Sequence, residues 1–225
     1  MVEINSWVDE LLGKVQKAFQ KRLLFFGLQG SYRRGEATRS SDIDIVVILD
    51  SLSIADLQVY KGIIATMAHS EKACGFISGR QELFAWPKYE LFQMQKETKA
   101  YFGSLDELLP QVDRKDIVDS AKIGASALYH AACHTFMYGP QEEHAAVLKG
   151  LYKGCFFILQ VTEYLRSGHY AQSKTQLLPL LAGPEKEILA IGMDWGAYQE
   201  DCTAKPQDYY EKIICWSSSV LQEQF

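Results

Sequence analysis

The stretch GLQGSYRRGEATRSSDIDIVVIL, residues 27–49, places two aspartates at the head of an apolar run. Residues 42–49 are rich in β-branched side chains, which favour a buried strand. Because successive side chains of a strand point to opposite faces, Asp42 and Asp44 are expected on one face, opposite the isoleucines. Two neighbouring carboxylates repel each other and lose solvation unless a cation neutralises them. The stretch therefore predicts a metal site, and its hard oxygen ligands favour Mg²⁺ or Mn²⁺ over zinc.

A turn rich in glycine and basic residues precedes the two aspartates. Residues 22–28 have the pattern of a short buried strand, which Gly30 and Ser31 follow. A glycine lets main-chain N–H groups approach phosphate oxygens, and a serine adds a small hydroxyl. Arg33 and Arg34 add positive charge that suits a polyphosphate. Together with the carboxylates about a dozen residues later, the turn predicts a nucleoside triphosphate site.

An Asp-x-Asp pair alone is common, and Asp42 after two serines also fits a strand edge or a turn. The composite of strand, Gly-Ser turn, basic loop and acidic strand is more specific. It resembles the signature of the DNA polymerase β-like nucleotidyltransferase superfamily. Members combine a small mixed sheet with helices and transfer a nucleoside monophosphate from a nucleoside triphosphate, using two metal ions. The resemblance implies that Gly30 and Ser31 hold the triphosphate and that Asp42 and Asp44 bind two Mg²⁺ ions.

The same resemblance implies a third carboxylate, on a neighbouring strand, that binds metal or takes the proton from the attacking hydroxyl. Glu90 heads an alternating apolar run after Pro87, whereas Glu82 lies in a segment closer to a helix or loop. We therefore expect Glu90 to be the third catalytic and metal-binding acid, with Glu82 as the alternative. The competing interpretation for both is a solvated surface glutamate.

The chain divides into two parts with different patterns. The first part predicts an α/β arrangement, with helices at 6–20 and 54–68 and strands at 22–28, 42–49 and within GFISG, KYELFQM and KETKAYFG. From about residue 113 the segments are long and apolar at helical spacing, which predicts helices at 113–138, 142–166, 173–192 and 206–224. The predicted fold is α+β: a mixed-sheet nucleotidyltransferase domain at 1–108 and an α-helical bundle at 109–225.

This layout resembles the aminoglycoside 3''-adenylyltransferases of the streptomycin and spectinomycin type. The resemblance implies transfer of AMP from ATP to a hydroxyl of a small molecule, with release of pyrophosphate. It also implies that Lys174 reaches the triphosphate from the second domain, although a solvated lysine at a helix start is an equal alternative. Lys149 and Lys153 on the helix expected to face the cleft weaken an antibiotic assignment. The segment MDWGAYQED offers acidic and aromatic contacts, with a surface loop as the alternative.

Two other functions fit a nucleotidyltransferase domain joined to helices. One is an antitoxin that transfers AMP to a partner protein; the other is a module that binds nucleotide without transfer. The RxxxxH pattern of the associated RNase toxins is missing, because Arg166 and His169 are only three residues apart. His130 and His134 have a spacing that zinc sites use, but their apolar neighbourhood predicts packed histidines instead.

Composition narrows the expected partners and location. A net charge of −5 and a pI near 5.6 argue against an extended nucleic-acid surface. The five cysteines have no CxxC spacing, which is typical of reduced cysteines in a cytosolic protein. The first residues lack the pattern of a signal peptide, and no apolar run reaches the ~18 residues of a membrane span. We therefore expect a cytoplasmic protein that does not bind membranes.

Overall fold

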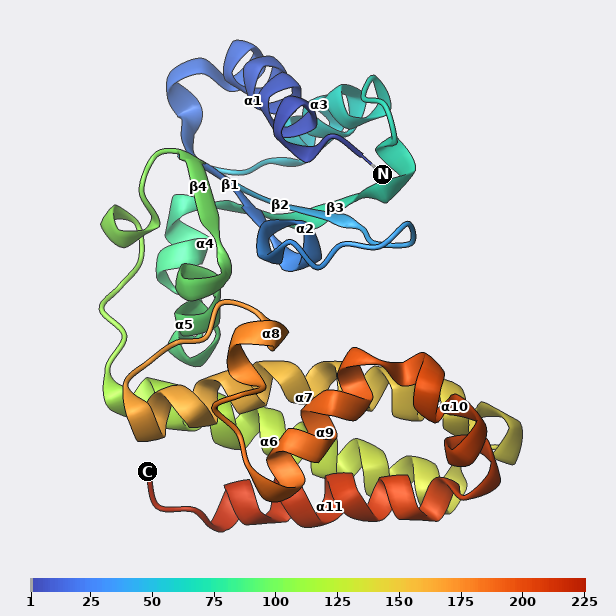
Figure 1. Ribbon diagram of the computed structural model, residues 1–225. Coiled ribbons are helices and arrows are strands. Elements are labelled where there is room, and N and C mark those ends of the chain that lie inside the picture. The colour runs from blue at the N-terminus through green and yellow to red at the C-terminus, as the bar shows by residue number, and fades with distance from the viewer. Residues whose placement is uncertain (1) are drawn as a thin grey trace. The chain divides into compact units, whose positions relative to one another are not determined.

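The computed structural model describes residues 2–225 (Figure 1). The chain separates into two compact units, Met1–Val112 and Asp113–Phe225. The first contains a sheet with helices and the second is helical, so the predicted α+β fold is confirmed. The boundary between the units lies close to the predicted division at residues 108 and 109.

Unit 1 is built on one mixed sheet whose strand order is β3-β2-β1-β4. β2 is antiparallel to β1 and parallel to β3, while β4 pairs antiparallel with β1. β2 lies between two neighbours, which explains why its sequence is nearly all apolar. The strands are β1 (Leu23–Gln29), β2 (Ile43–Leu49), β3 (Ala73–Gly79) and β4 (Lys99–Phe102).

Helices α1 (Ile4–Phe19) and α3 (Ile54–Ala65) cover one face of this sheet (Figure 1). The apolar side of α1 packs on the odd-numbered residues of β2 in one buried cluster. The start of α3 is fixed by a capping box, in which Ser53 and Asp56 exchange hydrogen bonds with each other's main chain. This face is therefore filled and leaves the other face of β2 to carry the site.

The opposite face is covered by shorter elements. Val46 and Ile48 of β2 form a second cluster here with side chains from α4 (Arg80–Phe84), α5 (Lys88–Glu97) and the segment that follows β4. The five-residue helix α2 (Gly30–Arg34) continues directly from β1. Short 3₁₀ turns complete the chain at Gln20–Arg22, Ser70–Lys72, Leu105–Glu107 and, in unit 2, Gln141–Glu143.

The prediction of a strand at KYELFQM is wrong, because these residues form α5. The segment is short, and its apolar residues fit a period of two almost as well as a helical period. Pro87 stands at the N-cap, where its fixed φ suits the start of a helix, and Leu91 and Phe92 are buried side by side. The strands expected within GFISG and KETKAYFG are present as β3 and β4.

Unit 2 is a bundle of long helices, as predicted. Its elements are α6 (Arg114–Tyr138), α7 (His144–Ser167), α8 (Lys174–Leu177), α9 (Gly183–Met193), α10 (Trp195–Ala204) and α11 (Pro206–Gln222). The single helix predicted at 173–192 is instead two helices, because α8 ends at Leu177 and α9 begins only at Gly183, which has a positive φ of 53° and is followed by Pro184 in the first turn. The segment MDWGAYQED spans the end of α9 and part of α10, so the surface-loop interpretation is also wrong.

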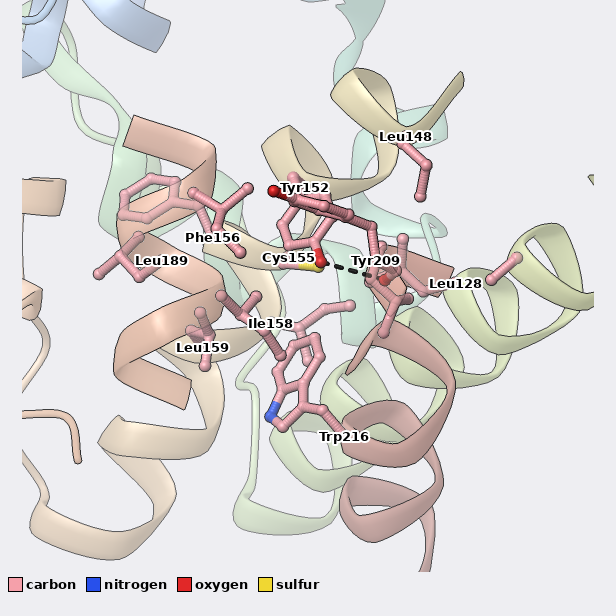
Figure 2. Close-up of a cluster of buried hydrophobic side chains, with 14 of the residues drawn as sticks. Leu128, Leu148, Tyr152, Cys155, Phe156, Ile158, Leu159, Leu189, Tyr209 and Trp216 are labelled. Carbon is pink, nitrogen blue, oxygen red and sulfur yellow. Dashed lines mark hydrogen bonds between the residues drawn. The ribbon is translucent and has the colours of Figure 1, made fainter. Parts of the chain in front are cut away.

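Helix α7 is the central helix of unit 2. Figure 2 shows its side chains within the buried cluster, where the Tyr152 hydroxyl donates a 3.0 Å hydrogen bond to the carbonyl of Tyr209. By length and composition alone, the segment 141–167 is apolar enough to cross a membrane, contrary to the sequence expectation. Half of its most apolar stretch is buried, which is the usual position of a core helix in a bundle.

Candidate active site

The turn after β1 and the start of β2 meet at one end of the sheet. Gln29, the last residue of β1, pairs with Asp44 near the start of β2. Ile43 and Ile45 are fully buried against α1 and α3, so the Asp44 side chain between them lies on the opposite face. Asp42 is exposed and immediately precedes β2. Both aspartates therefore emerge at the end of the sheet where the Gly30 turn lies.

Gly30 is in direct contact with Asp44. Its φ is +69°, a region that L-residues rarely adopt. A Cβ at this position would collide with Oδ2 of Asp44 and lie 2.8 Å from Cγ. Any side chain here would thus strain the turn and displace the carboxylate. The glycine turn and the Asp44 carboxylate consequently form a single site.

Ser31 follows within the first turn of α2 and is partly buried. Its carbonyl accepts a 2.8 Å hydrogen bond from the main-chain N–H of Glu36, which folds the loop back over α2. Gly35, in the left-handed conformation, ends the helix. The loop around Ser31 is thus held by main-chain bonds, so the hydroxyl sits on a fixed frame beside Gly30.

The two arginines of α2 have protein partners. Arg34 is an almost buried side chain whose Nη1 donates to Oε2 of Glu97 at 2.8 Å, and whose Nε donates to Oε2 of Glu36 at 3.1 Å. Arg33 donates from Nη2 to the carbonyl of Lys96 at 2.9 Å. Arg34 therefore serves to attach α2 to α5, and a phosphate would have to compete with two carboxylates for it. The predicted phosphate contacts of both arginines stay predictions.

The expectation of a third acid on a neighbouring strand is not met. In the register of β2 and β3, the residue beside Asp44 is Cys74. The sequence of β3 is ACGFISG, and β1 and β4, read along LLFFGLQ and KAYF, also lack aspartate and glutamate. Any third carboxylate must therefore approach the aspartates from outside the strands.

Glu82 lies at the wrong end of the sheet for this role. It follows β3, whose last residue, Gly79, pairs with Leu49 at the far end of β2. Leu49 is five residues from Asp44, or about 16 Å along the strand at the usual rise of about 3.3 Å. The register thus prevents Glu82 from sharing an ion with Asp44.

Glu90 is on the exposed first turn of α5, so the prediction that it lies on a strand is wrong. Its Oε2 accepts a 2.6 Å hydrogen bond from the indole Nε1 of Trp86. Trp86 packs edge-on against Phe76 of β3, with ring centroids 5.2 Å apart. Glu90 also raises the pKa of Tyr89, mainly through a hydrogen bond to the phenol. Trp86 therefore connects Glu90 to the face of the sheet on which Asp44 lies.

The donor set fits an ion that is shared with a substrate. Among residues 2–225 there is no group of three or more His, Cys, Asp and Glu side chains arranged to hold a metal. Asp42 and Asp44 provide two carboxylates, and Mg²⁺ commonly takes one or two carboxylates and completes its shell with water and substrate phosphates. This pair therefore suits Mg²⁺ brought in with a polyphosphate and does not form a closed protein cage.

Residues predicted in unit 2 have mostly local roles. Lys174 begins α8, and its Nζ lies 5.7 Å from the centroid of the Phe156 ring. Its contact with a triphosphate stays a prediction. In the segment MDWGAYQED, Trp195 is buried in the core and Asp201 accepts a 3.0 Å hydrogen bond from the Tyr209 hydroxyl. These side chains therefore support the bundle.

His130 and His134 are exposed, so the expectation of packed histidines is wrong. Their ring centroids lie 5.8 Å apart, and the ring of His134 also contacts Tyr138. The two histidines thus belong to a row of aromatic side chains on the surface of α6.

The contact between the end of α5 and α2 was not predicted from the sequence. Glu97 is buried and ion-paired with Arg34, and Thr98 accepts a 2.6 Å hydrogen bond from the Gln29 side chain. Each pair joins residues more than sixty positions apart, so no local sequence pattern predicts the contact. The local sequence here is a glutamate between a lysine and a threonine. The same composition is common at the exposed end of a helix, so it did not indicate a buried ion pair.

Comparisons with known proteins agree with this geometry. A family model described as a nucleotidyltransferase domain matches residues 8–121, just over half of the 225-residue chain. Among solved structures, spectinomycin adenyltransferase AAD(9) from Enterococcus faecialis with ATP and spectinomycin is similar, with a TM-score of 0.59 and 13% sequence identity. The match covers 97% of this chain and 99% of that chain, and at this identity it shows a shared fold. No curated protein matches the sequence.

Proposed function

Because the chain belongs to the nucleotidyltransferase domain family, we propose that it transfers AMP from ATP to a hydroxyl group of a small molecule and releases pyrophosphate. The observation that carries the proposal is the contact between Gly30 and Asp44, since it brings the turn proposed to bind phosphate against a carboxylate proposed to bind metal. The similar AAD(9) structure contains ATP and spectinomycin, which supports ATP as the donor and a small molecule as the acceptor.

Each residue of the site has a role in this proposal. The main chain at Gly30 and the hydroxyl of Ser31 bind the β- and γ-phosphates. Asp42 and Asp44 would hold Mg²⁺, which supplies neutralisation of the phosphate charge when bound. The acceptor oxygen bonds to the α-phosphorus while the bond from that phosphorus to pyrophosphate breaks. Glu90 takes the proton of the acceptor hydroxyl, since it is exposed and the Trp86 indole orients its carboxylate through a hydrogen bond to Oε2.

The proposal is tested by pyrophosphate release from ATP, measured with and without Mg²⁺ in the presence of a panel of hydroxylated acceptors. We expect release that needs both Mg²⁺ and an acceptor, and its loss in Asp44→Asn. Asp50→Asn is the matched control, because Asp50 follows the opposite end of β2 and pairs with Arg22. Full activity of Asp44→Asn would contradict the proposed mechanism.

A second candidate function is nucleotide binding without transfer. The observation that favours it is the composition of the strands, since β1, β3 and β4 offer no carboxylate beside Asp44. In this case the protein would bind Mg²⁺ and ATP with the same residues but would release no pyrophosphate with any acceptor. The same assay, combined with a measurement of ATP binding, separates the two functions.

A further inference from the structure

The last two residues of α5 and its C-cap residue, Thr98, each bind one residue of the segment 29–34, which contains the Gly30–Ser31 turn. The carbonyl of Lys96 accepts from Nη2 of Arg33 at 2.9 Å. Oε2 of Glu97 accepts from Nη1 of Arg34 at 2.8 Å. The Thr98 hydroxyl accepts from Nε2 of Gln29 at 2.6 Å. The bonded residues of the turn segment, at 29, 33 and 34, flank Gly30 and Ser31 on both sides, so the turn is fastened at both ends.

The Arg34–Glu97 pair is the most costly of these contacts to break. The two side chains are only 8% and 7% exposed, and Arg34 also bonds to Glu36. Moving charges out of water is unfavourable, and removal of one partner leaves the other buried and uncompensated. The pair therefore specifies one position of α2 relative to α5 and penalises any other.

Packing at the third contact leaves little freedom as well. A Cβ on Gly27, two residues before Gln29, would lie 2.6 Å from Cγ2 of Thr98. The Thr98 hydroxyl itself donates to the carbonyl of Met94 within α5 at 2.5 Å. β1 and the end of α5 are consequently in close contact up to the residue that precedes Gly30.

The position of α2 matters because Gly30 has no clearance from Asp44. With only five residues, α2 has few hydrogen bonds of its own to fix its place. We propose that Glu97 is a positioning residue that acts through Arg34 to hold the Gly30–Ser31 turn against Asp44. It thereby sets the affinity of the site for Mg-ATP. This inference rests on the proposed function and adds a residue to that site.

A merely structural ion pair would affect stability and leave nucleotide affinity unchanged. Unit 1 contains a matched control in Arg22 and Asp56, whose Nη1 and Oδ1 atoms are 2.6 Å apart. This pair lies where β1 begins and β2 has ended, at the opposite end of the sheet from Gly30. Asp56→Asn therefore removes an ion pair of the same unit at a position distant from the Gly30–Ser31 turn.

The test measures the Kd of Mg-ATP by titration calorimetry in the wild-type 225-residue chain, Glu97→Gln and Asp56→Asn, at a temperature where thermal melts show each protein folded. We expect Glu97→Gln to raise the Kd about tenfold, because small displacements of binding groups have large effects, and Asp56→Asn to leave it unchanged. We also expect Arg34→Met to raise the Kd. The double variant of Arg34→Met and Glu97→Gln should bind Mg-ATP no more weakly than the single variants, because both changes break the same ion pair.

Thr98→Val provides a second variant if Glu97→Gln does not fold, because it removes only the hydroxyl, which accepts from Gln29 and donates to the carbonyl of Met94. We expect it to raise the Kd about threefold, in line with the loss of the one hydrogen bond that reaches the turn segment. Wild-type affinity in the folded variants, or an equal weakening in Asp56→Asn, would overturn the positioning role. A wild type that binds no Mg-ATP would instead overturn the proposed function, so the two failures are distinguishable.

Discussion

Gly30 is the residue at which sequence and site are most tightly linked. Its positive φ explains why a glycine follows β1. Its contact with Asp44 is a second reason, because a side chain at this position would collide with the carboxylate. The Asp-x-Asp pair and the Gly-Ser turn could be predicted from sequence because both are local patterns. Their contact needs the antiparallel pairing of Gln29 with Asp44, which the motif alone does not specify.

Gly30→Ala is predicted to abolish nucleotide binding, because the methyl group would displace the Asp44 carboxylate. Gly35→Ala is the matched control: Gly35 has a similar φ of +71°, but a Cβ there would meet no atom within 4 Å. Both variants are expected to lose about 1–2 kcal/mol of stability from the left-handed backbone. ATP titrations of the two folded proteins should differ, and equal binding would contradict the role of the contact.

Glu90 and Glu82 are distinguished by their environment. Glu90→Gln is predicted to lower the rate of pyrophosphate release by about 10²–10⁴-fold, the usual contribution of a general base. Glu82→Gln is predicted to leave the rate unchanged, because Glu82 follows the far end of β3. Rates at saturating ATP and acceptor provide the measurement. An unchanged rate in Glu90→Gln would remove this residue from the mechanism.

At the scale of elements, periodicity predicted the sheet strands and the long helices but not every boundary. The β-branched run of β2 fits a strand and the long apolar period of α7 fits a helix, so both elements were predicted correctly. α5 is ten residues long and fits two periods, and only its buried contacts decide in favour of a helix. The Gly183–Pro184 pair was a local sign of the break before α9, but the apolar residues around it obscured that sign.

The pairing of Arg22 with Asp56 predicts how the stability of unit 1 depends on pH. Hydrogen bonds from Arg22, and secondarily from Ser53, hold the pKa of the Asp56 carboxyl well below its ordinary range. A group with a lowered folded-state pKa stabilises the protein above its unfolded pKa of about 4, and this stabilisation is lost as the pH falls below that value.

The thermal midpoint is therefore expected to fall between about pH 5 and about pH 3 more steeply in the wild type than in Asp56→Asn. Circular dichroism melts at several pH values provide the measurement. Parallel curves for the two proteins would show that Asp56 titrates normally in the folded state.

At the scale of the whole molecule, the change of pattern near residue 113 predicted two units because each must bury its own core. Unit 1 has clusters on both faces of its sheet, and unit 2 has one large cluster around α7. Membership of the nucleotidyltransferase domain family and the fold shared with AAD(9) confirm the resemblance drawn from residues 27–49. The sequence did not identify the acceptor, because no local pattern in it is specific to one class of hydroxylated molecule.

The most direct test of the central claim needs no acceptor. It measures the affinity of wild type and Asp44→Asn for a non-hydrolysable ATP analogue, in Mg²⁺ and in a chelator. If the Gly30 turn and the two aspartates form one site, Mg²⁺ should tighten binding to the wild type and have little effect on Asp44→Asn. Equal dependence on Mg²⁺ in both proteins, or no binding by the wild type, would contradict the account.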